Sequence, residues 1–306
     1  MSPSHALVLG VVQGLTEFLP ISSSGHLLLV PWILGWPSHS LTFDVALHMG
    51  TLAALLVYFW RDLWLLVAAW LPASATMGRG ALGLVGGEAS EAGRGTGTGQ
   101  GEAAGTSGAQ AALERQQRRR FGLGLVVGSI PGAVIGALFA SEIEASLRAP
   151  LLVALMMAVA AVLLAAADRA GVRRLGLDAI GLPQAAIIGL AQAMALAPGV
   201  SRSGVTLAAA LFLGLTREAA TRYVFLLGVP ITAGAGIFQL RHLFRDGIPP
   251  DERGAFLLGI TASLVVGLLA IGGMLRYVRH RSLDVFVGYR VVLAAVVVLL
   301  AVVRAL

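Results

Sequence analysis

Two short polar segments interrupt an otherwise apolar chain and hold most of the side chains that could do chemistry. The first, residues 20–26, reads Pro-Ile-Ser-Ser-Ser-Gly-His and follows Gln13 and Glu17. The second, residues 198–206, reads Pro-Gly-Val-Ser-Arg-Ser-Gly-Val-Thr. Ionisable side chains inside apolar segments are costly and usually mark a functional site. An acid, a base, a guanidinium and several hydroxyls together indicate a site that acts on a phosphate group.

Gln13 and Glu17 lie four residues apart, so on a helix their side chains point the same way. A carboxylate and an amide oxygen on one face can hold Mg²⁺ or Ca²⁺, which would also bind a substrate phosphate. The alternative is a polar pair that hydrogen-bonds neighbouring helices. Because a lone glutamate in an apolar stretch is rarely kept for packing, we predict a metal site at Gln13 and Glu17, with Glu17 also catalytic.

The serines that precede His26 allow two interpretations. Serine favours the N-cap position of a helix, which requires no further role. Serine and histidine at a helix start also supply a nucleophile, a base and amide donors for an anion. We therefore predict that Ser23 and His26 are catalytic. Ser22 and Ser24 are predicted to bind phosphate. The nucleophile is either Ser23, with His26 or Glu17 as its base, or His26 itself.

Arg202 stands between two serines at the start of a second apolar run. Its planar guanidinium matches phosphate oxygens, and the helix start adds backbone N–H donors. The alternative is an arginine that caps the carbonyls of a broken helix. We predict that Arg202 is catalytic and binds phosphate together with Ser201, Ser203 and Thr206.

Asp44 and His48 are also four residues apart. They could hydrogen-bond to His26 or to the metal ligands and so orient them. Alternatively, they could lie in the lipid headgroup layer without a catalytic task. The sequence leaves both readings open.

The bulk composition places the chain in the membrane class. Hydrophobic residues make up 57% and charged residues 12% of its 306 residues, and the mean hydropathy is +0.83. There is no cysteine, which excludes disulfides, zinc–thiolate sites and cysteine nucleophiles. The basic residues lie in loops between apolar runs, which indicates membrane orientation and not nucleic-acid binding.

An all-α polytopic fold follows from the hydropathy pattern, because a span needs about 20 apolar residues. Two stretches, 6–34 and 184–215, are broken by the polar segments and are predicted to be re-entrant helix–loop–helix pairs. Residues 62–73 are predicted to form an interfacial helix. The six predicted full spans are 43–60, 121–141, 150–168, 221–240, 254–275 and 286–304.

The chain is predicted to be one membrane domain made of two repeats, about 1–73 plus 115–175, and 180–306. Gly189 minus Gly10 is 179, and at the same offset Ser22 meets Ser201 and Ser24 meets Ser203. Each half would cross the membrane an odd number of times, so the halves would be inverted and the broken helices would meet at the midplane. Residues 74–114 are rich in Gly, Ala, Ser and Thr, and are predicted to be a disordered cytoplasmic loop.

Arginine placement predicts the orientation. The loops 61–120, 169–183 and 276–285 are basic, whereas acidic residues balance the arginines in loops 142–149 and 241–253. The first set is therefore expected in the cytoplasm, with both termini and the mouth of the Glu17 site outside.

The motifs resemble those of the bacterial undecaprenyl-diphosphate phosphatase family, also called bacitracin resistance protein. The resemblance rests on Gln13-xxx-Glu17, the segments 20–26 and 198–206, and Phe43-Asp44-Val-Ala-Leu-His48-Met-Gly-Thr51. It implies hydrolysis of undecaprenyl diphosphate to the monophosphate carrier of peptidoglycan synthesis, at the outer face of the plasma membrane, with a divalent cation. The family's first acidic position is Glu or Gln. Gln13 would therefore serve metal or substrate binding and not acid–base chemistry.

A lipid-phosphate transporter or flippase is the rival, because inverted repeats with broken helices are typical of secondary transporters. The serine, histidine and glutamate set favours the enzyme, since a carrier does not need it. The expected partners are the lipid diphosphate and the bilayer. A homodimer is also among the expected assemblies.

Overall fold

The computed structural model describes residues 1–72 and 100–305, without the side chains of 100–109, 140–141, 144–145 and 239–246. The described chain is helical apart from its loops and an isolated bridge between Leu175 and Leu215. Six of its helices are long and apolar enough to cross a membrane, which confirms the six predicted spans. These are α3 (Leu41–Tyr58), the Gln110–Phe139 part of α5 (Gln100–Leu147), α6 (Pro150–Ala170), the Arg217–Phe238 part of α9 (Arg217–Asp246), α10 (Arg253–His280) and α11 (Asp284–Ala305).

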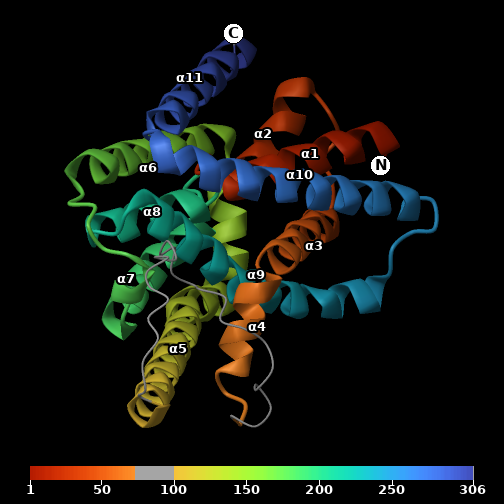
Figure 1. Ribbon diagram of the computed structural model, residues 1–306. Coiled ribbons are helices and arrows are strands. Elements are labelled where there is room, and N and C mark those ends of the chain that lie inside the picture. Colours follow the sequence, from red (N-terminus) through yellow and green to blue (C-terminus); the bar gives the residue numbers. More distant parts are fainter. Residues whose placement is uncertain (73–99, 306) are drawn as a thin grey trace.

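The two interrupted stretches form helical hairpins of shorter helices (Figure 1). α1 (Pro3–Phe18) is followed by α2 (Ser23–Leu34), and α7 (Leu182–Ala193) with a 3₁₀ turn (Met194–Leu196) is followed by α8 (Arg202–Phe212). A proline follows the first helix of each pair and prevents the helix from continuing. It is Pro20 in the first loop and Pro198, followed by Gly199, in the second.

Both hairpin loops end on a serine with an unusual backbone. Ser22 has φ 78° and Ser201 has φ 75°, and no other non-glycine residue of the described chain has a positive φ. Each serine caps the next helix, because its Oγ accepts a hydrogen bond from the N–H of Gly25 (3.3 Å) or Gly204 (3.1 Å). The same strained cap therefore stands at the same place in both motifs.

Close backbone contacts fix the first helix of each hairpin. α1 lies along α10 and α7 lies along α5. A Cβ atom added to Gly10 would collide with the carbonyl oxygen of Gly259, and one added to Gly189 would collide with that of Gly128. Glycine at these positions lets the helix backbones touch, as in other membrane helix pairs.

The amino-terminal end of α5 differs from the sequence-based expectation. The helix begins at Gln100, so residues 100–114, which were expected to be disordered, are helical; the rest of that segment, 73–99, lies outside the described residues. The alanines and Leu113 of residues 109–114 continue the helix at little cost, whereas Gly101, Gly105 and Gly108 each disfavour it by about 1 kcal/mol relative to alanine. The arginine side chains also hold α5 to the end of α4 (Trp60–Ala68), where Arg119 donates to the Ala69 carbonyl at 2.7 Å.

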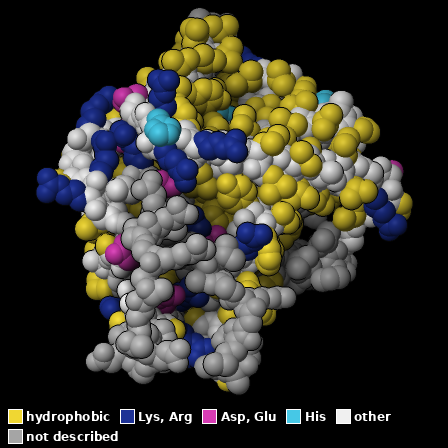
Figure 2. Space-filling view, viewed as in Figure 1, with side chains coloured by type: hydrophobic (Ala, Val, Ile, Leu, Met, Phe, Trp, Pro, Cys, Tyr) yellow, Lys and Arg dark blue, Asp and Glu magenta, His cyan; other side chains and the backbone are white. Residues whose placement is uncertain are grey.

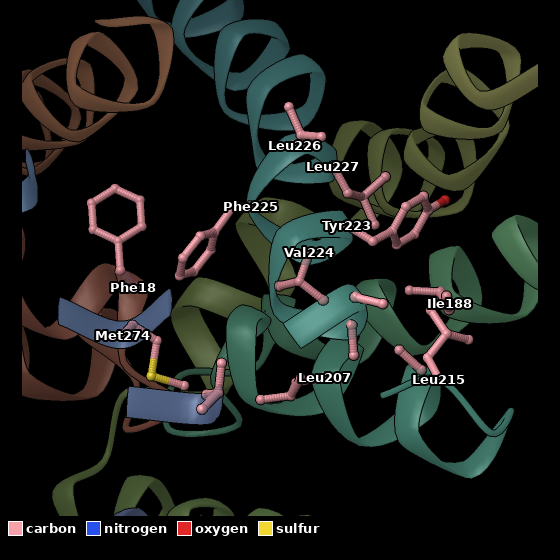
Figure 3. Close-up of a cluster of buried hydrophobic side chains, with 14 of the residues drawn as sticks. Phe18, Ile188, Leu207, Leu215, Tyr223, Val224, Phe225, Leu226, Leu227 and Met274 are labelled. Atoms are coloured by element: carbon pink, nitrogen blue, oxygen red, sulfur yellow. The ribbon is translucent and has the colours of Figure 1, made fainter. Parts of the chain in front are cut away.

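A buried aromatic cluster anchors the carboxyl end of α1 (Figure 3). Phe18 is 1% exposed and packs edge-on against Phe225 of α9, with ring centroids 5.5 Å apart. Met274 of α10 and Leu207 of α8 belong to the same cluster. The residue before Phe18 is Glu17, so core packing places this carboxylate beside α8 and α9.

The outside of the molecule carries large exposed apolar side chains over α10 and α11 (Figure 2). Leu257 and Leu269 of α10 are 67% and 71% exposed, and Val292 and Leu299 of α11 are each 63% exposed. Continuous apolar surface of this kind suits contact with lipid chains. Arginine side chains gather together at one edge of the same view.

Candidate active site

The two hairpin loops meet, although their sequence positions differ by about 180 residues. Arg202 Nη2 lies 2.6 Å from Glu17 Oε1 and forms an ion pair with it. Ser203 Oγ donates to the Leu19 carbonyl at 3.0 Å. The first turn of α8 is therefore bonded directly to the end of α1.

Glu17 is the centre of the polar cluster. Its Oε2 accepts hydrogen bonds from Ser23 Oγ at 2.5 Å and from Gln13 Nε2 at 3.0 Å. His48 Nε2 stands 3.7 Å from the same oxygen. The side chain of Glu17 is only 6% exposed, and a buried carboxylate needs such partners to remain ionised.

α9 holds the other side of Arg202. Its Nη1 donates to the Gly228 carbonyl at 3.2 Å and to Thr232 Oγ1 at 2.8 Å. One edge of the guanidinium is thus fixed, while Nη2 points to the Glu17 side of the cavity. Sequence reasoning missed Thr232, which carries no motif of its own in an apolar run.

The cluster opens into a cavity of about 460 Å³, within the range of small-ligand sites. Both polar and apolar residues line it. The polar residues are Glu17, Ser23, Ser24, Ser38, His39, Asp44, His48, Arg148, Ser201, Arg202, Ser203 and Thr232. The apolar residues include Leu27, Leu28, Leu41, Val45, Leu196 and Ile231.

Asp44 and His48 lie at the cavity and not only near the surface. His48 Nδ1 is 2.8 Å from the Asp44 carbonyl, which leaves Nε2 directed to Glu17. The Asp44 carboxylate is 2.6 Å from His39 Nε2 and 3.7 Å from Arg148. Both residues of the pair therefore line the cavity, with His48 beside the carboxylate. His39 and Arg148 also line the cavity, and no motif pointed to them.

Four residues of the predicted site do not line this cavity, namely Gln13, Ser22, His26 and Thr206. His26 turns away from Ser23: its Nδ1 is 2.7 Å from the Ser22 carbonyl and its Nε2 is 2.7 Å from Tyr289 Oη. Ser22 caps α2, and the fully buried Thr206 donates to the Arg202 carbonyl at 2.6 Å. In this geometry Glu17, and not His26, is placed to take the proton of Ser23.

Oxygen donors suited to a hard cation surround Glu17. Gln13 Oε1 is buried without a hydrogen-bond partner, Nε2 of the same amide donates to the Glu17 carboxylate, and the Ser23 hydroxyl contacts that carboxylate too. Within residues 1–72 and 100–305, however, no three His, Cys, Asp or Glu side chains come together to hold a metal ion. The donor set fits a cation that takes its remaining ligands from a bound phosphate and water.

Fold and site together define a class, the polytopic helical membrane protein with a polar cluster held between two helix-hairpin loops. Within that class the chain belongs to the family described as bacitracin resistance protein BacA, whose model matches residues 6–296. The resemblance found in the motifs is thereby confirmed.

Relatives match over almost the whole chain. The undecaprenyl-diphosphatase of Geobacter sulfurreducens is 42% identical over 292 residues, 95% of each chain. That of Geobacter metallireducens is 42% identical over 300 residues, and that of Thermomicrobium roseum is 38% identical over 306 residues; each match covers 98% of both chains.

Proposed function

We propose that this chain is an undecaprenyl-diphosphatase, which cleaves undecaprenyl diphosphate to undecaprenyl phosphate and inorganic phosphate. The full-length similarity to enzymes of that name supports the activity. The single observation that carries the proposal is the ion-paired Glu17–Arg202 cluster with Ser23, in a cavity that apolar side chains also line. The polar lining residues suit the diphosphate, and the apolar lining residues suit the first prenyl units.

The reaction begins at Ser23. Its Oγ attacks the terminal phosphorus while Glu17 Oε2, 2.5 Å away, takes the hydroxyl proton. The bond from that phosphorus to the bridging oxygen breaks, and the electron pair leaves with undecaprenyl phosphate. Water then attacks the phosphoserine, Glu17 relays the proton to Ser23 Oγ, and inorganic phosphate is released. Direct attack by water, with Glu17 as base, gives the same products.

Arg202 stabilises the charge of the transferred phosphoryl group. Nη1 stays bound to Gly228 and Thr232, while Nη2 exchanges Glu17 for a phosphoryl oxygen. Ser201 and Ser203 add hydroxyls, and Ser24 and the N–H groups at the start of α2 and α8 add donors. Positioning and charge stabilisation of this kind supply most of the rate in phosphoryl transfer.

Glu17 and Gln13 would hold Mg²⁺ or Ca²⁺, which neutralises negative charge on the diphosphate when bound. The buried, unpartnered Gln13 Oε1 supports this assignment, because a cation would satisfy that oxygen. His48 lies 3.7 Å from the same carboxylate and would orient it.

The hairpins would be re-entrant segments of an inverted-topology repeat. The capped positive-φ serines at the 179-residue offset (Ser201 minus Ser22), and the paired glycine contacts of α1 and α7, support this arrangement. The positive-inside pattern supports a site that opens to the outer face of the bacterial plasma membrane. That face is where a lipid diphosphate would meet the enzyme.

The test is phosphate release by the detergent-solubilised protein. We expect the purified wild type to release phosphate from undecaprenyl diphosphate with added Mg²⁺ or Ca²⁺, and to lose the activity when a chelator removes the ion. Soluble pyrophosphate should be a poor substrate, because it has no prenyl chain to contact the apolar residues of the cavity. A folded protein that releases no phosphate, but moves the lipid between the leaflets of vesicles, would favour the transporter instead.

A further inference from the structure

Arg290, in the second turn of α11, is the largest fully buried side chain of the described residues. It is 0% exposed, and none of the ion pairs among the described residues includes it. A buried arginine without an acid is expensive, and such residues in membrane helices usually have a function. Neither the family match nor the mechanism above uses it.

The guanidinium of Arg290 joins the two hairpin loops. Nη1 donates to the Pro20 carbonyl at 3.2 Å, and Nη2 donates to the carbonyls of Gly199 and Val200 at 2.8 and 3.0 Å. Nε donates to Met157 of α6 at 3.1 Å. Pro20 and Gly199 each stand two residues before a positive-φ serine, so one side chain holds both loops at equivalent points.

These contacts satisfy loop carbonyls and support the strained backbone of the loops. Loop carbonyls have no helical partner, and an unsatisfied carbonyl away from water costs free energy. Strained residues such as Ser22 and Ser201 persist only where their surroundings hold them. The five donors of an arginine meet both needs, whereas a lysine or a neutral side chain offers fewer fixed donors.

The same contacts lie directly behind the reacting groups. α2 begins with Ser23 and α8 begins with Arg202, each one residue after its capping serine. A Cβ atom added to Gly204 would lie 3.0 Å from Arg290 Nη1, so the guanidinium packs under the first turn of α8.

The neighbour of Arg290 supports the first loop by another route. Tyr289 Oη is 2.7 Å from His26 Nε2, and His26 Nδ1 is 2.7 Å from the Ser22 carbonyl. The two rings are stacked, with an interplanar angle of 10°. Tyr289 and Arg290 of α11 thus reach the backs of both loops.

We propose that Arg290, assisted by Tyr289, is a positioning residue for the phosphatase reaction. It sets the Ser23 loop and the Arg202 loop at the separation at which both reach one phosphoryl group. The inference rests on the proposed function, and its alternative is a purely structural role in the stability of the fold.

The experiment compares Arg290→Lys with wild type and with Arg304→Gln. Arg304 is a matched control on the same helix, because it also donates to two backbone carbonyls, those of Trp32 and Ile33, but at the exposed end. We expect Arg290→Lys to lower kcat by about 10²-fold with less effect on KM, since a displacement on the order of 1 Å has that consequence. Arg304→Gln should leave kcat unchanged.

A double-mutant cycle separates positioning from stability. In an Arg202→Lys background, Arg290→Lys should lower kcat by a much smaller factor than in wild type. The Arg202 guanidinium, which Arg290 positions, is already absent from that background. An equal fold-loss in both backgrounds, or a wild-type kcat in folded Arg290→Lys, would overturn the proposal. A wild type without phosphate release would instead overturn the proposed function.

Tyr289→Phe covers the case in which Arg290→Lys does not fold. Tyr289 is 44% exposed, so losing its hydroxyl should leave thermal unfolding unchanged. We expect a several-fold lower kcat, and no change in kcat would contradict the role of α11 in placing the loops.

Discussion

At the scale of single residues, the assignment of the active site depends on the different partners of the two carboxylate oxygens of Glu17. One oxygen is paired with Arg202, and the other accepts the hydroxyl of Ser23. Residue types and spacing alone pointed to these three side chains, because charge in an apolar run calls for a function. The direction of His26 could not be predicted, since it depends on Tyr289, which is 263 residues away. Arg290 carried the same signal as Arg202, a charge within a predicted span, but no motif surrounded it.

His26→Gln tests whether the histidine acts in the reaction or supports the loop. A glutamine can still donate to the Ser22 carbonyl, so the loop should keep its shape and most of the phosphate release should remain, with a loss of about tenfold or less. Steady-state phosphate release in detergent measures the effect. If His26 were the nucleophile, the variant would be inactive although folded.

At the scale of helices, hydropathy was sufficient for the six spans, because apolar length is a property of local sequence. It was not sufficient for α5, which begins at Gln100 although its first residues are polar. The positive-φ caps at Ser22 and Ser201 were also beyond prediction, since tertiary bonds from α11 sustain them.

Gly10→Ala tests the contact between α1 and α10. The added methyl group would meet the Gly259 carbonyl, so the helices must separate, and we expect a clear fall in the thermal unfolding temperature. Gly273→Ala is the matched control on α10, because nothing lies within 4 Å of its added Cβ. The control should be as stable as wild type or slightly more stable. Equal stability of the two variants would show that the close approach is not required.

At the scale of the whole molecule, the proposed topology places the cavity and the basic loops on opposite sides of the membrane. The natural chain has no cysteine, so single cysteines report sidedness without background. Ser38, at the cavity, and Arg174, in a basic loop, are both exposed in the structure.

We expect an impermeant maleimide to label Ser38→Cys in intact cells and Arg174→Cys only after the membrane is opened. The basic-loop rule gives this direction. The reverse pattern would place the site in the cytoplasm and would remove the proposed access to lipid diphosphate at the outer face.

The most direct test of the account is the rate of phosphate release by Ser23→Ala. The Ser23 hydroxyl, which is hydrogen-bonded to Glu17, is the proposed nucleophile. We expect a loss on the order of 10³-fold or more in kcat, as for other enzymes that lose their nucleophile, with an unchanged unfolding temperature. Thr261→Ala, which removes an exposed hydroxyl of α10, is the control and should retain the wild-type rate. A folded Ser23→Ala protein that releases phosphate at a rate near that of wild type would contradict the assignment.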